Sequence, residues 1–192
     1  TDAGNAGIIV LDLVSGDARR VLDGHRSVTA GHERNIVLGG QTLKAPDGTA
    51  LRVNADPLEV SPNGEWLYFG PLQGPWSKVR ITDLTASALT PAQLASRVEP
   101  FADLPPTGGT VMDASGNLYF SDLAQDAIRV RRPDGRIETL IVDPRLHWVD
   151  APFLDRDGTL WLPAAQMDRV GLFNDGTTRV QWPMTVFRLS KW

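Results

Sequence analysis

The apolar positions of this chain fall in short runs that end at glycine-containing turns. Residues 56–69, 108–120 and 150–162 share one pattern: an apolar segment, a turn that ends in glycine, and a second run rich in β-branched and aromatic residues. The turn glycines of the three copies lie 52 and 42 residues apart. Repeats of about 40–50 residues built from short strands are typical of β-propeller blades. We therefore interpret the three stretches as the inner hairpins of successive blades.

The rest of the chain is divided around these hairpins into parts of one propeller domain that spans residues 1–192. Its predicted parts are the outer hairpin of a blade (7–22), two blades (52–104 and 108–143) and a last blade without its outermost strand (148–192). Residues 24–49 are predicted to form a long excursion that carries a small hairpin of its own. Thr90 followed by Pro91 predicts the start of a short helix that ends near Val98.

The predicted strands number two, four, four and three along the chain, so the blades at its two ends are incomplete. Propellers have about four to eight blades of four strands, and an uncovered sheet edge is an aggregation liability. The two deficits are complementary. We therefore expect a missing N-terminal half, or alternatively a second chain, to close the ring.

Composition excludes several classes of function. The chain has 192 residues, a net charge of −4 and no basic tract, which argues against a nucleic-acid partner. No stretch approaches the roughly 18 consecutive apolar residues of a membrane span, so no membrane association is expected. The sequence has no cysteine, and therefore neither disulfides nor a thiol nucleophile.

Five segments carry a resemblance to a known family: GIIVLDLVSGDARRVLDGH, SPNGEWLYFGPLQG, DASGNLYFSDL, DPRLHWVDAP and TVFRLS. Together they resemble the C-terminal half of the yellow/major royal jelly protein family, as in its bacterial members. The chain is more distantly similar to regucalcin/gluconolactonase and strictosidine-synthase-like propellers. The resemblance implies an all-β, six-bladed β-propeller, of which this chain supplies about the C-terminal half, and a secreted or periplasmic location. The family is functionally mixed, so the fold does not define an activity.

Counting eight residues back from each turn glycine identifies equivalent positions at one rim of the predicted propeller. These positions hold Asp56, Gly108 and Asp150. On the second-strand side, the candidates include Asp122 and Gln166. Trp148 precedes Asp150 by two residues and is placed to wall a pocket, while Glu59 points either into the channel or into the sheet.

The first hypothesis for this rim is a divalent cation such as Ca²⁺, which collects carboxylate oxygens from several segments. The resemblance to lactonase-type propellers implies Asp56 and Asp150 as metal ligands, together with a Glu from a first blade that is absent here. Gly108 removes one oxygen ligand. The competing hypothesis is a metal-free pocket in which the aspartates, Trp148 and Gln166 bind a cationic or aromatic amine.

Two classes of function therefore stay open. One is an enzyme, a lactone hydrolase or tautomerase in which Asp56 and Asp150 act as ligands or as acid and base groups. The other is a non-catalytic protein that binds a small aromatic or amine ligand in the same pocket.

Several other polar and aromatic residues are expected to be structural. Asp113 and Asp155 flank turns and are expected to cap backbone N–H groups. The strand aromatics are expected to pack between sheets; they are Trp66, Tyr68, Tyr119 and Trp161. His147 is the only histidine near the predicted rim.

Overall fold

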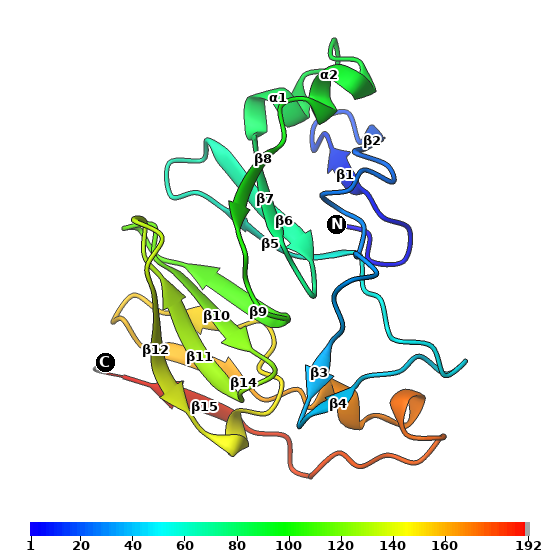
Figure 1. Cartoon of the computed structure of the whole chain (residues 1–192). Coiled ribbons are helices and arrows are strands. Elements are labelled where there is room, and N and C mark those ends of the chain that lie inside the picture. The colour runs from blue at the N-terminus through cyan, green and yellow to red at the C-terminus, as the bar shows by residue number, and fades with distance from the viewer. Residues whose placement is uncertain (191–192) are drawn as a thin grey trace. The chain divides into compact units, whose positions relative to one another are not determined.

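The computed structural model describes residues 1–190 and is built mainly of short antiparallel strands (Figure 1). The chain forms two compact units, one of residues 1–34 with 53–104 and the other of residues 35–52 with 105–192. In the described residues, no helix is long and apolar enough to cross a membrane.

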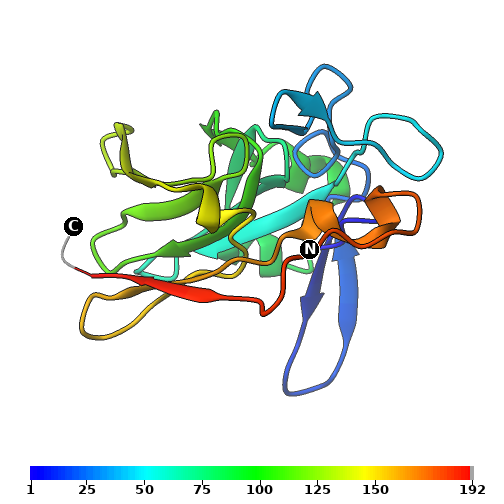
Figure 2. The same ribbon diagram turned by 90° about the horizontal axis from the view of Figure 1, so that it is seen from below.

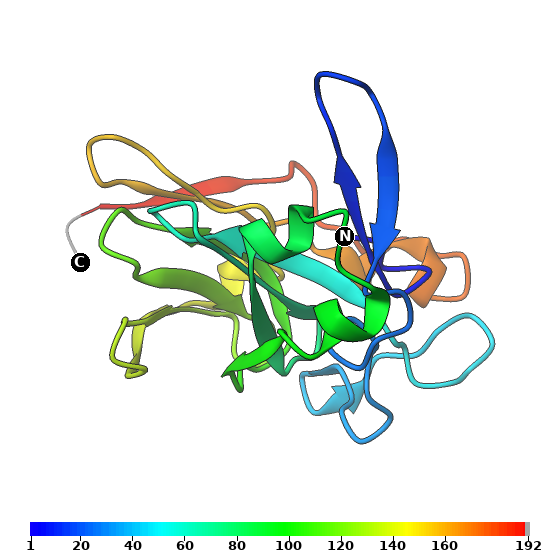
Figure 3. The same cartoon turned by 90° about the horizontal axis from the view of Figure 1, so that it is seen from above.

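The first unit contains a two-stranded hairpin, a four-stranded sheet and two short helices. Its elements are β1 (Ile8–Leu11), β2 (Ala18–Val21), β5 (Ala55–Val60), β6 (Trp66–Pro71), β7 (Trp76–Arg80), α1 (Ile81–Thr85), α2 (Pro91–Ala95) and β8 (Glu99–Ala102). The sheet is an antiparallel meander in the order β5-β6-β7-β8. One buried cluster joins the base of the hairpin to the sheet and helices, through Ile8, Phe69, Val79, Leu84 and Leu94. The turn end of β1–β2 extends away from the rest of this unit (Figure 3).

The second unit contains a four-stranded sheet, a three-stranded sheet and a small hairpin. Its strands are β3 (Val37–Leu38), β4 (Gln41–Thr42), β9 (Thr107–Met112), β10 (Leu118–Asp122), β11 (Ala127–Arg131), β12 (Ile137–Val142), β13 (Phe153–Leu154), β14 (Leu160–Pro163) and β15 (Val186–Leu189). Three single-turn 3₁₀ helices are η1 (Pro144–Leu146), η2 (Met167–Arg169) and η3 (Gly171–Phe173). The sheets are meanders in the orders β9-β10-β11-β12 and β13-β14-β15.

One hydrophobic core joins these two larger sheets of the second unit. Tyr119, Ile128 and Val130 of the four-stranded sheet pack in the same buried cluster as Leu160 and Leu162 of β14. Figure 2 shows the two sheets side by side. Four-stranded antiparallel meanders of this kind are typical of propeller blades.

The first strands of both four-stranded sheets, β5 and β9, are interrupted at the same place by a β-bulge. In β5, Asp56 and Pro57 lie between the residues that pair with Pro71 and Phe69. In β9, Gly108 and Gly109 lie between the residues that pair with Asp122 and Phe120. A bulge kinks a strand and changes the direction of its side chains.

The segment before β13 has the corresponding irregularity. Val149 bridges Ala164, Phe153 pairs with Trp161, and the N–H of Asp150 donates to the carbonyl of Pro163 at 3.0 Å. Asp150 therefore comes directly after the paired residue Val149. In the same way, Asp56 comes directly after Ala55, and Gly108 after Thr107.

Gly108 and Gly109 are required because the next segment of the second unit lies directly against them. A Cβ on Gly108 would lie 2.7 Å from the carbonyl oxygen of Val149, and one on Gly109 would lie 2.5 Å from the nitrogen of Ala151. The buried hydroxyl of Ser121 accepts from the N–H groups of Gly108 and Gly109 and donates to the Val149 carbonyl at 2.7 Å. The sequence interpretation of Gly108 as a lost ligand position misses this steric role.

The helix and hairpin predictions are confirmed in part. Thr90 caps α2 through a capping box with Gln93, and α2 ends at Ala95, slightly before the predicted end. The small hairpin β3–β4 lies within the predicted excursion. Within the predicted 52–104 blade, β7 ends at Arg80 and α1 follows directly.

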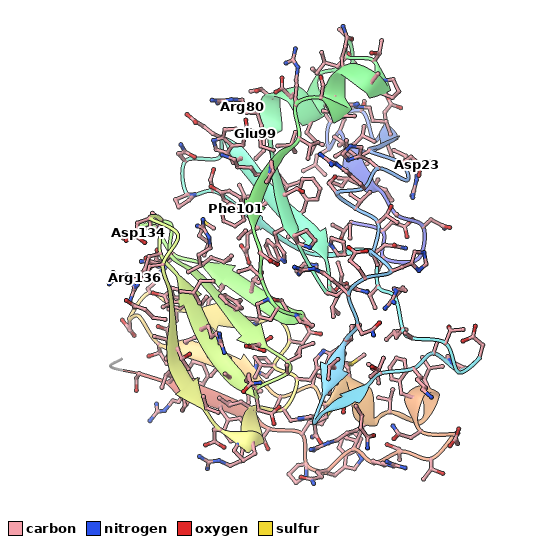
Figure 4. The ribbon with its side chains drawn as sticks, viewed as in Figure 1. Asp23, Arg80, Glu99, Phe101, Asp134 and Arg136 are labelled. Atoms are coloured by element: carbon pink, nitrogen blue, oxygen red, sulfur yellow. The ribbon has the colours of Figure 1, made fainter. Side chains whose placement is uncertain are left out.

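The four strand aromatics differ in their surroundings. Tyr119 packs between the two larger sheets of the second unit, as predicted. Tyr68 stacks on Phe101 of its own sheet, with ring centroids 4.2 Å apart; Phe101 is labelled in Figure 4. Trp66 lies under the cations of Lys78 and Arg80. The Trp161 indole is exposed and donates to Asp155 at 2.8 Å, so the prediction of inter-sheet packing is wrong for Trp161. For Trp66 and Tyr68 it stays a prediction.

Replacing Gly109 with alanine tests the close approach of β9 to the 149–152 segment. The added methyl would overlap the backbone of Ala151, and overpacking of this kind costs about 1–3 kcal/mol. Urea denaturation of Gly109→Ala should show this loss in the free energy of unfolding. Gly4→Ala is the matched control, because its nearest neighbour would be the Asp2 carboxylate at 3.6 Å. Equal stability of the two variants would contradict the packing.

Candidate functional site

Asp150 is a half-buried carboxylate at the start of the last sheet. Its side chain accepts a hydrogen bond from the N–H of Ala151 at 2.8 Å. Burial raises the pKa of the Asp150 carboxyl above its ordinary value of 3.8, and the Ala151 hydrogen bond offsets only part of this shift. A carboxyl group with a raised pKa is suited to accept or donate a proton nearer to neutral pH.

The backbone around Asp150 is strained. Trp148, Ala151 and Gln166 have φ values of 51°, 46° and 52°, in the left-handed region that residues other than glycine rarely adopt. The segments are paired, because the N–H of Ala165 donates to the Trp148 carbonyl at 2.9 Å. Left-handed non-glycine residues cost about 1–3 kcal/mol each and cluster at functional sites. Strain at three nearby positions therefore marks this end of the sheet as a candidate site.

Trp148 and Gln166 are both buried. The amide oxygen of Gln166 accepts from the Arg169 guanidinium at 2.7 Å and from the N–H of Gln181 at 3.0 Å. Its amide nitrogen donates to the Gln181 carbonyl at 3.1 Å. Gln166 therefore closes the loop of residues 166–181, called the 166–181 loop below, and its contact with a ligand stays a prediction.

Asp122 ends β10 and is 3% exposed. Its Oδ2 lies 3.0 Å from Nε of Arg129, at an angle that makes an ion pair without a hydrogen bond, and its Oδ1 accepts from the N–H of Ala124 at 3.1 Å. Burial raises the pKa of Asp122, and the charge of Arg129 opposes this shift. Asp122 is thus a paired structural carboxylate as well as a candidate for ligand contact.

Asp56 and Glu59 lie in β5 of the first unit. Asp56 occupies the bulge, and its backbone carbonyl accepts from the hydroxyl of Thr1 at 3.1 Å. Glu59 pairs across the sheet with Tyr68. The structure pairs the backbone segment of Trp148 and Asp150 with the segment that ends at Gln166. A common site for their side chains, and the grouping of Asp56 and Glu59 with them, stay predictions.

Sequence reasoning missed a cluster centred on His147. The Nδ1 of His147 lies 2.8 Å from Oδ1 of Asp126, and its Nε2 lies 2.8 Å from Oδ1 of Asp168. These carboxylates, Asp168 above all, raise the pKa of His147 against the opposing effect of burial. Each aspartate is 21 residues away in the sequence, so no local motif marks the cluster.

The turn aspartates are structural, as predicted. Asp113 accepts from the N–H groups of Ser115 and Asn117, and Asp155 accepts from those of Asp157 and Thr159. Within residues 1–190, no group of three or more His, Cys, Asp or Glu side chains is arranged to hold a metal ion.

The antiparallel meanders and their shared bulges define an all-β protein built from blade-type sheets. A family model described as "Major royal jelly protein" matches residues 1–185. The chain therefore belongs to the major royal jelly protein family, and the resemblance found in the sequence is confirmed. No curated protein matches the sequence significantly.

Solved structures similar to this chain include two enzymes and a calcium-binding protein. A gluconolactonase from Xanthomonas campestris is 16% identical, with 83% of this chain and 42% of that chain covered and a TM-score of 0.49. The calcium-binding protein regucalcin from Agrobacterium tumefaciens is 17% identical, with 84% of this chain and 62% of that chain covered and a TM-score of 0.44. A virginiamycin B lyase from Staphylococcus aureus is 15% identical, with 82% of this chain and 42% of that chain covered and a TM-score of 0.46.

The chain thus spans between about two fifths and three fifths of the length of these structures. At these identities and TM-scores, the likenesses carry no argument about the activity of this chain.

The His147 cluster predicts a pH-dependent contribution to stability. Because the folded-state pKa of His147 is raised, its stabilisation is fully present below the unfolded value near 6.5 and is lost as the pH rises through the folded-state pKa. Asp168→Asn should lower the free energy of unfolding by about 1–3 kcal/mol near pH 6, and by less as the pH rises. Urea denaturation between about pH 6 and 9 measures both effects.

Asp175→Asn is the control for this experiment, since Asp175 lies in the same loop and is exposed. It should leave the pH dependence of the wild type unchanged. Identical pH dependence in Asp168→Asn and the wild type would contradict the ion pair.

Proposed function

We propose that this chain belongs to a six-bladed propeller that acts on a small molecule at the sheet end where Asp150 lies, as a lactone hydrolase or tautomerase. The observation that carries the proposal is the half-buried Asp150 carboxyl, whose pKa is raised by burial. The strained backbone at Trp148, Ala151 and Gln166 supports it, because such strain persists where the surrounding structure holds it. Asp56 joins the proposed site because it occupies the equivalent bulge of its own sheet.

In the hydrolase, Asp150 takes the proton of a water molecule that attacks the lactone carbonyl carbon. The bond between this carbon and the ring oxygen then breaks, and the ring oxygen takes the proton back from Asp150 and becomes a hydroxyl group of the open chain. In the tautomerase, Asp150 removes a proton from one position of the substrate and returns the same proton at another, so the carboxylate is regenerated. Both roles require a carboxylate that is shielded from water, because desolvation makes it a stronger base. Trp148 lines the site and limits the access of water.

The alternative proposal is a non-catalytic binding protein for a small aromatic or amine ligand. A carboxylate beside an aromatic side chain suits a cation, through charge pairing and stacking on the ring. Asp150, Trp148 and Asp122 would supply these contacts, with Glu59 and Gln166 as further candidates.

A calcium ion at Asp56 and Asp150 fits the oxygen chemistry of the two carboxylates but not their number. Ca²⁺ takes about six to eight oxygen ligands, and the described residues hold no cluster of three ionisable ligands. Among the described residues, the carboxylates alone are therefore too few for a calcium site, and no step of the proposed reaction passes through a metal.

We also propose that further blades complete the ring, from an N-terminal half or from a second chain. The strand numbers support this proposal. In the described residues, β1–β2 form a sheet of two strands and β13–β15 a sheet of three, whereas β5–β8 and β9–β12 form sheets of four.

Asp150→Asn tests the site directly in the full protein. Turnover of a panel of five- and six-membered sugar lactones, followed by proton release, should fall at least about 100-fold, because positioned acid–base groups contribute that much. Asp157→Asn is the control, since Asp157 is an exposed carboxylate of the nearby turn. Equal turnover in Asp150→Asn and the wild type would contradict the enzyme proposal. Binding of phenethylamine that depends on Asp150, without turnover, would favour the binding protein.

Chelation tests the calcium hypothesis separately. If the complete ring holds a cation, EDTA should lower the melting temperature and added Ca²⁺ should restore it, because a ligand that binds only the folded state stabilises it. A melting temperature that does not respond to either reagent would rule out a stabilising calcium site.

A further inference from the structure

A cavity of about 580 Å³ lies within the second unit, between the β3–β4 hairpin and the 166–181 loop. This volume is in the usual range of about 300–1,000 Å³ for small-molecule sites. The hairpin side and the loop side each contribute five lining residues: Leu38, Gln41, Thr42, Leu43 and Lys44, and Asp168, Phe173, Asn174, Asp175 and Arg179. Apart from Asp168, none of these residues belongs to the proposed reaction site or to the His147 cluster.

The cavity has one cation on each wall. In the part of the chain that the structure describes, neither Lys44 nor Arg179 lies within 4.0 Å of a carboxylate oxygen. Arg132, by contrast, is paired with Glu138 at 2.8 Å. Two unpaired cations facing one cavity favour an anionic ligand, and arginine suits a carboxylate because its N–H groups can bind both oxygens.

The acidic residues of the cavity do not cancel this preference. Asp168 is already paired with His147, so its charge is compensated. Asp175 is exposed, as Lys44 and Arg179 are, so one remaining carboxylate stands against two cations. Leu38, Leu43 and Phe173 add an apolar part to the lining, which an inorganic anion would not use.

The loop wall is held in place before any ligand binds. The side-chain amide of Asn174 donates to the carbonyls of Asp168 and Val170 at 2.8 and 2.9 Å. The N–H of Arg179 donates to the Arg169 carbonyl at 2.7 Å, and Gln166 ties the end of the loop to Gln181. A preformed wall lowers the entropic cost of binding.

We propose that this cavity binds a small organic carboxylate, with the carboxylate between Lys44 and Arg179 and the apolar body against Leu38, Leu43 and Phe173. The proposal does not depend on the proposed activity at Asp150.

Calorimetric titration of the full chain with 3-phenylpropionate tests the proposal. We expect saturable binding with a dissociation constant below roughly 10 mM, since a few partly exposed contacts are involved. Lys44→Ala and Arg179→Ala should each weaken binding roughly three- to fivefold, as exposed ion pairs do. The neutral analogue 3-phenylpropionamide and inorganic phosphate should both bind more weakly than the carboxylate.

Arg156→Ala is the matched control, because it removes an exposed cation of the same unit outside the cavity. It should leave the affinity unchanged, as should Asp150→Asn, which separates this site from the proposed reaction site. Equal affinity for the carboxylate and the amide, or no effect of both cavity variants, would overturn the proposal. So would the absence of binding by the folded wild-type protein, or tighter binding of phosphate than of 3-phenylpropionate.

Discussion

The arrangement at Asp150 depends on one buried hydroxyl, that of Ser121. It accepts from two consecutive N–H groups of the β9 bulge and donates to the carbonyl of Val149, so it joins a four-stranded sheet to the segment that begins the last sheet. Side chains on the bulge would prevent this contact, and both bulge residues, Gly108 and Gly109, are glycines. Unpaired buried N–H and C=O groups are costly, so satisfying three of them with one side chain fixes the distance between the two segments.

This constraint explains the environment of Asp150. With Val149 tied to Ser121, the chain turns through left-handed backbone at Trp148 and Ala151, and Asp150 is left half-buried with the N–H of Ala151 as its hydrogen-bond donor. The equivalent bulge in the first unit carries Asp56 and Pro57 in place of two glycines. The same backbone irregularity thus carries an aspartate in two sheets, Asp56 and Asp150. In the third sheet, it carries glycine and allows close packing. Membership of the major royal jelly protein family is consistent with either of the proposed functions, because a fold does not define its chemistry.

The sequence predicted the parts of this structure that depend on local patterns. Counting from the turn glycines found equivalent bulge positions, because a short hairpin fixes the register of its strands. The start of α2 was predicted for the same reason, since the N-cap Thr90 and Pro91 are neighbours in the sequence, and the structure adds a capping box between Thr90 and Gln93. The cluster around His147 could not be predicted, because Asp126 and Asp168 reach it only through the order of the strands and the path of the 166–181 loop. The steric reason for Gly108 was equally hidden, because it comes from a segment 41 residues later.

The central claim is that Ser121 and the bulge hold Asp150 in a partly desolvated position suited to proton transfer. Measuring the titration of the Asp150 carboxyl carbon by NMR in the folded protein tests it most directly. The account predicts a pKa for Asp150 above its ordinary value of 3.8, and a return toward that value in Ser121→Ala, where the segment is released. A pKa for Asp150 at or below 3.8 in the wild type would contradict the account.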